Sequence, residues 1–65
     1  MGGVKMFRSK KDDIQDYLIK KGYDIIEYMS ENEGWHYLKV RKGWDGVHTV
    51  KVKEGIFTKY DIQKV

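Results

Sequence analysis

The chain has 65 residues, of which 13 are Lys or Arg and 10 are Asp or Glu, so its formal net charge is +3. This length allows one domain with a modest core. The absence of Cys excludes disulfides and thiolate metal sites, and two His alone make a poor zinc shell. We therefore expect one small domain over residues 1–65 that depends on aromatic packing and binds no metal or cofactor.

Charge is unevenly distributed along the sequence. Residues 1–11 carry four bases and no acids (+4), residues 12–34 carry seven acids against two Lys (−5), and residues 35–65 carry seven bases against three acids (+4). This segregation predicts a basic surface on one part of the fold and an acidic surface elsewhere. The alternative is that the acids of helix and loop are simply solvated.

The N-terminal part of the chain predicts a short flexible segment followed by a helix. We expect residues 1–8, which begin Met1-Gly2-Gly3, to be flexible, and residues 10–21 to form the helix. Ser9 is a suitable N-cap, acids crowd the first turns, and Gly22 is a natural left-handed stop. One apolar stripe at helical spacing contains Ile14, Tyr17 and Leu18.

The rest of the chain has the composition of β-strands. Residues 23–29 are β-branched and aromatic and predict a first strand, which the polar loop 30–34 follows. Residues 35–41 and 47–53 alternate in polarity and predict a second and a third strand, joined through the turn signal Asp45-Gly46.

The C-terminal tail admits two interpretations. A two-residue turn at Glu54-Gly55 would make residues 56–62 a fourth strand. Alternatively, Thr58 with Asp61 would cap a last helical turn. We favour the strand.

The alternation also predicts the register of the central strands. Leu38 and Val40 share one face, as do Val50 and Val52, and the pairing that groups them places Val50 opposite Leu38 and His48 opposite Val40. This pairing needs an odd loop or a bulge, which a positive φ at Gly46 would supply. The predicted core is Ile14, Leu18, Leu38, Val40, Val50 and Val52, closed by Ile25 or Ile26. The fold class is α+β: one N-terminal helix on one face of a three- to four-stranded antiparallel meander.

The face that the helix leaves uncovered predicts a function. Its cations would contact phosphates and its aromatic rings would stack on bases or wedge between them. The candidate nucleic-acid-binding residues are Trp35, Tyr37, Lys39, Arg41, Trp44, Lys51 and Lys53. The partner would be DNA or RNA.

Two other interpretations of this face remain open. Trp, Tyr and Arg also dominate protein–protein hot spots, so the domain could instead be an inhibitor or regulator of a larger protein. The face could also be plainly solvated, with Trp35 packed under the stems of Lys51 and Lys53. His36 and His48 do not lie opposite one another in the favoured register, so we expect no shared metal.

Composition also bears on location and assembly. No apolar run approaches a membrane span and no signal-peptide core is present, so we expect a soluble cytoplasmic protein without a membrane partner. The exposed strand edges offer a route to a homodimer, which would add stability to so short a chain.

Residues 14–28, IQDYLIKKGYDIIEY, resemble the opening helix and strand of the restriction-endonuclease-like nucleases. The resemblance implies a strand after the helix and then a central hairpin. The catalytic motif of that family has an Asp and then Glu-x-Lys on the next strand. The nearest match here is Lys51-Val52-Lys53, in which Lys51 stands at the Glu position, so the metal site of the family cannot form. We therefore carry over no catalytic residue and expect a nonenzymatic protein.

Overall fold

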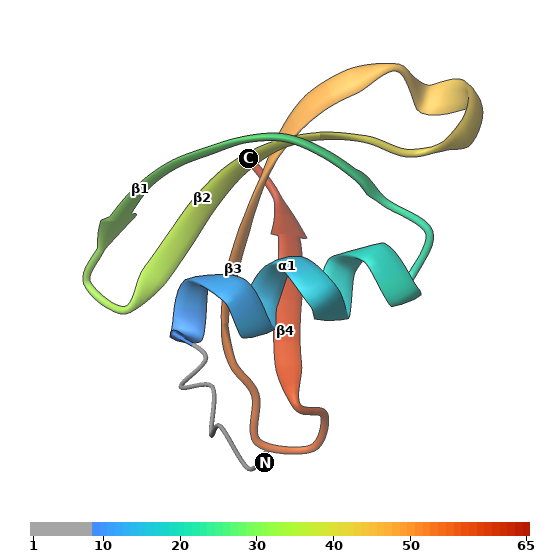
Figure 1. Cartoon of the computed structure of the whole chain (residues 1–65). Helices are drawn as coiled ribbons and strands as arrows, with labels where there is room; N and C mark the ends of the chain where they lie inside the picture. The colour runs from blue at the N-terminus through green and yellow to red at the C-terminus, as the bar shows by residue number, and fades with distance from the viewer. Residues whose placement is uncertain (1–8) are drawn as a thin grey trace, which may run out of the picture.

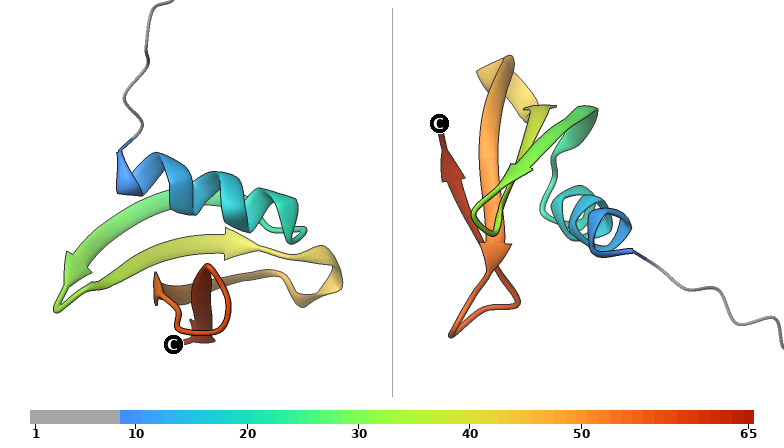
Figure 2. Two further views of the ribbon diagram at one scale, coloured as in Figure 1. Left: turned by 90° about the horizontal axis from the view of Figure 1, so that it is seen from below. Right: turned by 90° about the vertical axis from the view of Figure 1, so that its left-hand side faces the viewer.

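A computed structural model describes residues 9–65, so the expectation for residues 1–8 lies outside the described residues. One helix precedes four strands, which form a single antiparallel sheet in the order β1-β2-β3-β4, and the helix lies across one face of that sheet (Figures 1 and 2). The α+β prediction is confirmed. The elements are α1 (Lys10–Lys20), β1 (Asp24–Asn32), β2 (Trp35–Arg41), the short 3-10 helix η1 (Gly43–Asp45), β3 (Val47–Glu54) and β4 (Tyr60–Lys64).

The ends of α1 are set by local capping. The side chain of Ser9 accepts a hydrogen bond from the backbone N–H of Asp12 at 3.2 Å, which satisfies one of the free donors of the first turn. At the other end Gly22 has φ 98°, its N–H bonds the carbonyl of Ile19, and the N–H of Tyr23 bonds the carbonyl of Leu18. This is a Schellman motif, which needs a left-handed residue that Gly supplies at little cost.

The β1–β2 connection is shorter than the sequence predicts. The loop predicted over residues 30–34 is wrong, because strand pairing continues to Asn32 opposite Trp35. The turn consists of Glu33 (φ 54°) and Gly34 (φ 83°), and two successive residues with positive φ are typical of a type I′ hairpin. The polar composition that indicates a loop is tolerated in an exposed edge strand.

Two register shifts interrupt the pairing of β1 with β2. They fall between Ile25 and Glu27 and between Tyr28 and Ser30, so that Ile25 lies opposite Val40 and Tyr28 opposite Leu38. Ile25 and Tyr28 pack against the core. Of the two candidates for closing the core, Ile25 is therefore the one that does so.

The predicted register of β2 and β3 is confirmed. Leu38 pairs with Val50, and Val40 pairs with His48. The connection is the odd five-residue loop 42–46, and Gly46 has the expected positive φ, 76°. Burial of four apolar residues on one face selects this pairing, because a slip of one residue would place them on the other face.

The β3–β4 connection differs from the two-residue turn predicted at Glu54-Gly55. A five-residue loop, 55–59, joins the strands and is closed by a 3.1 Å hydrogen bond from the N–H of Gly55 to the carbonyl of Lys59. The tail is a strand, as favoured, but it begins at Tyr60. Thr58 does not cap a helix, since its hydroxyl donates to the carbonyl of Tyr60 at 2.8 Å.

The core contains every residue predicted for it. Ile14, Leu18, Leu38, Val40, Val50 and Val52 are all at most 1% exposed. Tyr60 joins them at 4% exposure, and its ring meets that of Tyr17 edge to face at 5.2 Å. The predicted core does not include Tyr60, because the prediction of a strand over 56–62 did not specify which of its faces meets the helix.

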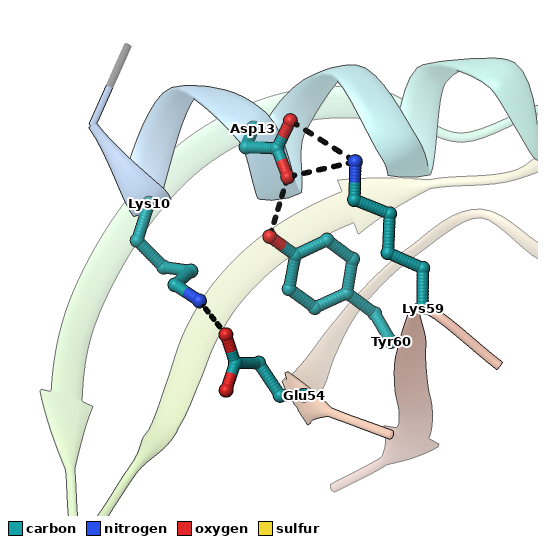
Figure 3. A network of polar contacts seen from close by, with 5 residues as sticks. All are labelled: Lys10, Asp13, Glu54, Lys59 and Tyr60. Carbon is teal, nitrogen blue, oxygen red and sulfur yellow. Dashed lines mark hydrogen bonds and ion pairs between the residues drawn. The ribbon is translucent and has the colours of Figure 1, made fainter. Parts of the chain in front are cut away.

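A polar network connects the start of α1 to β3 and β4 (Figure 3). The hydroxyl of Tyr60 donates to the Asp13 carboxylate at 2.5 Å, and the ammonium of Lys59 lies 3.2 Å from the same carboxylate. Lys10 forms an ion pair with Glu54. Burial, and then the bond to Asp13, raises the pKa of Tyr60 to about 12, so its hydroxyl remains a donor at neutral pH.

Candidate nucleic-acid interface

The face of the sheet opposite α1, here called the open face, holds six of the seven candidate residues. In β2 every second residue is buried, and in β3 Val50 and Val52 are buried, on the face that α1 covers. The residues between them keep part of their surface exposed. Cross-strand pairing places Tyr37 beside Lys51 and Lys39 beside Thr49. The six are Trp35, Tyr37, Lys39, Arg41, Lys51 and Lys53.

Trp44 does not belong to this face. It lies in η1 at the tip of the β2–β3 hairpin, which extends beyond the helix, and its side chain is fully exposed (Figure 1). The candidate set therefore comprises a sheet face and, as the sequence predicts for Trp44, the hairpin tip.

Two lysines gather around one indole ring at the end of the open face next to the β1–β2 turn. The ammonium of Lys51 lies 4.5 Å from the centroid of the Trp35 ring, and that of Lys53 lies 4.8 Å from it. Both distances are in the range of cation–π attraction. The alternative in which Trp35 packs under these two side chains is therefore the arrangement found. The ring holds the two cations in place, and it is not a free platform for stacking.

Acidic residues border the open face on the side of β1. Asp24 pairs with Arg41 in the register, and its carboxylate lies 3.7 Å from the Nε of Arg41. Glu27 lies opposite Lys39. On the β1 side, two of the four candidate cations thus have an acid as cross-strand neighbour, which reduces the positive potential there.

The border on the side of β4 is mixed. Asp61 lies opposite Lys53, whereas Lys51 has Gln63 on one side and Tyr37 on the other. Lys51 is therefore the cation of this face whose two cross-strand neighbours are both uncharged. Positive charge is concentrated on the middle of β3, beside Trp35, and decreases toward both borders.

Two apolar side chains that the sequence does not predict on the open face also reach it. Met29 is 48% exposed, and its sulfur lies 4.0 Å from the hydroxyl of Thr49, across β2. Val47, opposite Arg41, is 54% exposed. In the sequence, the adjacent apolar pair Tyr28-Met29 is the feature that could have indicated the position of Met29. A bulge lets the first residue of such a pair face the core and the second face outward.

The two histidines occupy unrelated positions. His36 is buried on the covered face opposite Val52, and its Nδ1 lies 2.7 Å from the hydroxyl of Tyr28. Burial, and then the Glu31 carboxylate, raises the pKa of Tyr28. The Nδ1 of His48 is 3.2 Å from the carbonyl of Gly46. As predicted, the histidines do not lie opposite one another. Within residues 9–65 no three His, Cys, Asp or Glu side chains are grouped closely enough to hold a metal ion.

Helix length and similarity to known proteins complete the description. A membrane-spanning helix needs about 20 mainly apolar residues, whereas α1 has 11, and no helix within residues 9–65 is long and apolar enough to cross a bilayer. No protein-family model, curated protein or solved structure shows significant similarity to the chain. The open face and the hairpin tip are therefore the features from which we infer a function.

Proposed function

We propose that this protein is a small, nonenzymatic nucleic-acid-binding module that contacts the phosphate backbone through its open face. The observation that carries the proposal is the pair of ammonium groups, from Lys51 and Lys53, held around the Trp35 ring on a face that α1 leaves uncovered. Lys39 and Arg41 extend the row of cations along β2.

The arrangement around Trp35 supports phosphate contacts more directly than base stacking. Each phosphate neutralised by a lysine releases condensed counterions, and this release is favourable at low salt. Because the indole ring restrains Lys51 and Lys53, less side-chain entropy is lost when they meet a phosphate. The role of Trp35 in this proposal is to position the two lysines. Tyr37 and Trp44 remain as the aromatic residues that can contact bases.

The acidic borders limit which form of nucleic acid can lie on the basic strip. Asp24 and Glu27 on one side and Asp61 on the other confine the positive strip to β2 and β3. Neighbouring strands lie about 5 Å apart, so the strip is about as wide as one phosphate backbone. A duplex would bring its second backbone toward the acids. The proposal therefore favours a single strand over a duplex.

The test is a titration with single- and double-stranded oligonucleotides of one sequence at two salt concentrations. We expect tighter binding of the single strand, with an affinity that falls steeply as salt rises. Lys51→Glu should weaken binding and flatten the salt dependence, whereas Lys20→Glu, the same charge change on the exposed end of α1, should alter both much less. Absence of binding at low salt, or equal loss in the two variants, would overturn the proposal.

One observation favours a second candidate function, binding of a protein partner. The open face also presents Met29 and Val47, each about half exposed, next to Tyr37 and Arg41. Apolar and aromatic anchors with a polar surround are typical of protein interfaces. An interface anchored in this way would show a shallow salt dependence, which separates it from phosphate binding in the same titration format.

A further inference from the structure

The two outer edges of the sheet are built differently. The pairing of β1 is interrupted by two register shifts, and bulges of this kind discourage a further strand from adding. The register of β4 with β3 is continuous from Tyr60 to Lys64. In the right-hand view of Figure 2, β4 forms the outer side of the sheet, away from α1.

The hydrogen bonds at the two ends of the β3–β4 ladder show which backbone groups of β4 face outward. The N–H of Val65 bonds the carbonyl of Thr49 at 3.0 Å, and the N–H of Gly55 bonds the carbonyl of Lys59. In an antiparallel ladder, hydrogen-bonded pairs alternate with pairs that are not bonded. The odd-numbered residues of β4 therefore bond to β3, and the even-numbered residues, Tyr60, Ile62 and Lys64, direct their N–H and C=O groups away from the sheet.

We propose that this outer edge of β4 binds the β4 strand of a second copy of the chain, antiparallel to it, about a two-fold axis at Ile62. Ile62 then lies opposite its own counterpart, and Tyr60 lies opposite Lys64 of the second copy. All three outward-facing residues exchange hydrogen bonds across the junction. The hydroxyl of Thr58 already donates to the carbonyl of Tyr60, and the second lone pair of that carbonyl remains for the junction.

Charge and length select this register among the symmetric ones. An axis at Asp61 would place two like charges directly opposite one another, which is destabilising. An axis at Gln63 would pair only three residues within β4, Ile62, Gln63 and Lys64, and would place Tyr60 and Asp61 opposite positions beyond the strand. The axis at Ile62 pairs all five residues of β4 and sets Asp61 opposite Gln63, so no like charges meet.

Exposed apolar residues at both ends of β4 also support a second copy of the chain as the partner. Ile56 and Phe57, in the loop before β4, are 90% and 97% exposed, and Val65, directly after it, is 71% exposed. Exposed apolar side chains that cluster in space commonly mark interaction sites. Antiparallel pairing brings the start of one β4 beside the end of the other, so Val65 of each copy approaches the loop with Ile56 and Phe57 of its neighbour. The two-fold axis repeats this contact at both ends of the junction.

The consequence is one continuous eight-stranded sheet. Since the register keeps residues of the same face opposite one another, both helices lie on one side and both open faces on the other. This dimer does not depend on the proposed function. It would place the two basic strips on the same side of the sheet, separated by the two β4 strands and their Asp61 residues.

Cysteine cross-linking tests the register, because the natural chain has no Cys. Asp61 and Gln63 of the second copy form a non-hydrogen-bonded pair, whose Cα atoms lie about 4.5 Å apart, within disulfide range. We expect Asp61→Cys protein mixed with Gln63→Cys protein to yield a disulfide-linked dimer on mild oxidation. Asp45→Cys, at the distant hairpin tip, measures random collision. Preferential cross-linking of Asp61→Cys with itself, or no cross-linking above the level of Asp45→Cys, would overturn the proposed junction.

Sedimentation of the unmodified protein tests the association itself. We expect a concentration-dependent dimer that Ile62→Pro abolishes, because Pro removes an outward N–H while leaving the bonds from β4 to β3 in place. The melting temperature of the wild-type protein should rise with concentration. A monomer at every concentration, with a constant melting temperature, would show that β4 does not bind a second copy and would leave its edge for a different protein strand.

Discussion

The two faces of the β2–β3 hairpin use alternate residues of the same two strands and have opposite properties. The central residues of the covered face are apolar and at most 1% exposed: Leu38, Val40, Val50 and Val52. On the open face their sequence neighbours are polar, aromatic or charged and keep part of their surface in solvent: Tyr37, Lys39, Thr49 and Lys51. A shift of one position along either strand therefore exchanges a residue that holds the fold for one that is available to a partner.

This difference predicts a clean separation of effects. Substitutions on the covered face should change the free energy of unfolding, since they remove buried contacts in a domain with little stability to lose. Substitutions on the open face should change binding and leave unfolding nearly unaffected. Each prediction below tests one side of that separation.

The largest expected effect is that of Leu38→Ala. Leu38 is fully buried between α1 and the sheet, and truncating such a side chain removes transfer free energy and leaves a cavity. We expect a loss of about 2–5 kcal/mol, enough to unfold much of the protein at ambient temperature. Thermal and urea unfolding followed by circular dichroism measure it, with Thr49→Ala on the open face as the control. An unchanged melting temperature would refute the core assignment.

The next effect concerns Tyr60, which holds α1 to β4 through Asp13. Tyr60→Phe keeps the buried ring and deletes the hydroxyl that donates to the carboxylate at 2.5 Å. A hydrogen bond to a charged group typically contributes about 1.5–3 kcal/mol, and the loss should lie at the lower end because Lys59 still neutralises Asp13. Tyr37→Phe, which removes an open-face hydroxyl, should cost much less in the same urea titration.

The dependence on pH gives a second measure of this bond. The pKa of Tyr60 is raised from 10.0 to about 12 in the folded protein, so the unfolded chain releases this proton first. Stability from Tyr60 is therefore complete below pH 10 and falls as pH rises toward 12. The slope of stability against pH in this window should be shallower for Tyr60→Phe than for the wild-type protein. Identical slopes would exclude the raised pKa.

The parts of the fold that the sequence predicts are those where two independent periodicities converge. The helical stripe with Ile14 and Leu18 and the alternation in β2 and β3 have one common solution, in which all the apolar residues meet. The same logic fixed Val50 opposite Leu38 and required the odd loop that ends at Gly46. These predictions succeeded because burial of apolar surface is the dominant favourable term in folding.

The parts that the sequence does not predict depend on contacts between distant residues or on backbone geometry. The bulges of β1 and the start of β4 at Tyr60 follow from fitting the core, and apolar Ile56-Phe57 has strand composition although it lies in a loop. The candidate site, like the fold, could be predicted only in part. Alternation placed Lys39 and Lys51 on one face, but it could not decide between a free Trp35 ring and a ring packed under Lys51 and Lys53, which is the arrangement found.

A smaller effect on stability is expected from Lys39→Glu and Lys51→Glu together. Both side chains lie on the open face and make no buried polar contact, so the free energy of unfolding should change by no more than about 0.5 kcal/mol per site. Binding of a single-stranded oligonucleotide should nevertheless weaken strongly. Circular dichroism and the oligonucleotide titration, run on the same samples, compare the two quantities. Unfolding of the double variant would contradict the assignment of these residues to the open face.

The smallest effect on stability belongs to Trp44, whose side chain is fully exposed at the hairpin tip. Trp44→Ala should leave the melting temperature unchanged, and if the indole stacks on a base, affinity should fall by about 1–3 kcal/mol with the salt slope preserved. Trp35→Ala should behave differently, because it releases Lys51 and Lys53 from the ring that restrains them and so alters the salt slope. Single-Trp variants assign the fluorescence: quenching by an oligonucleotide in Trp35→Phe reports on Trp44 alone. Equal salt slopes for Trp35→Ala and Trp44→Ala would mean that the indole of Trp35 does not organise the lysines for binding.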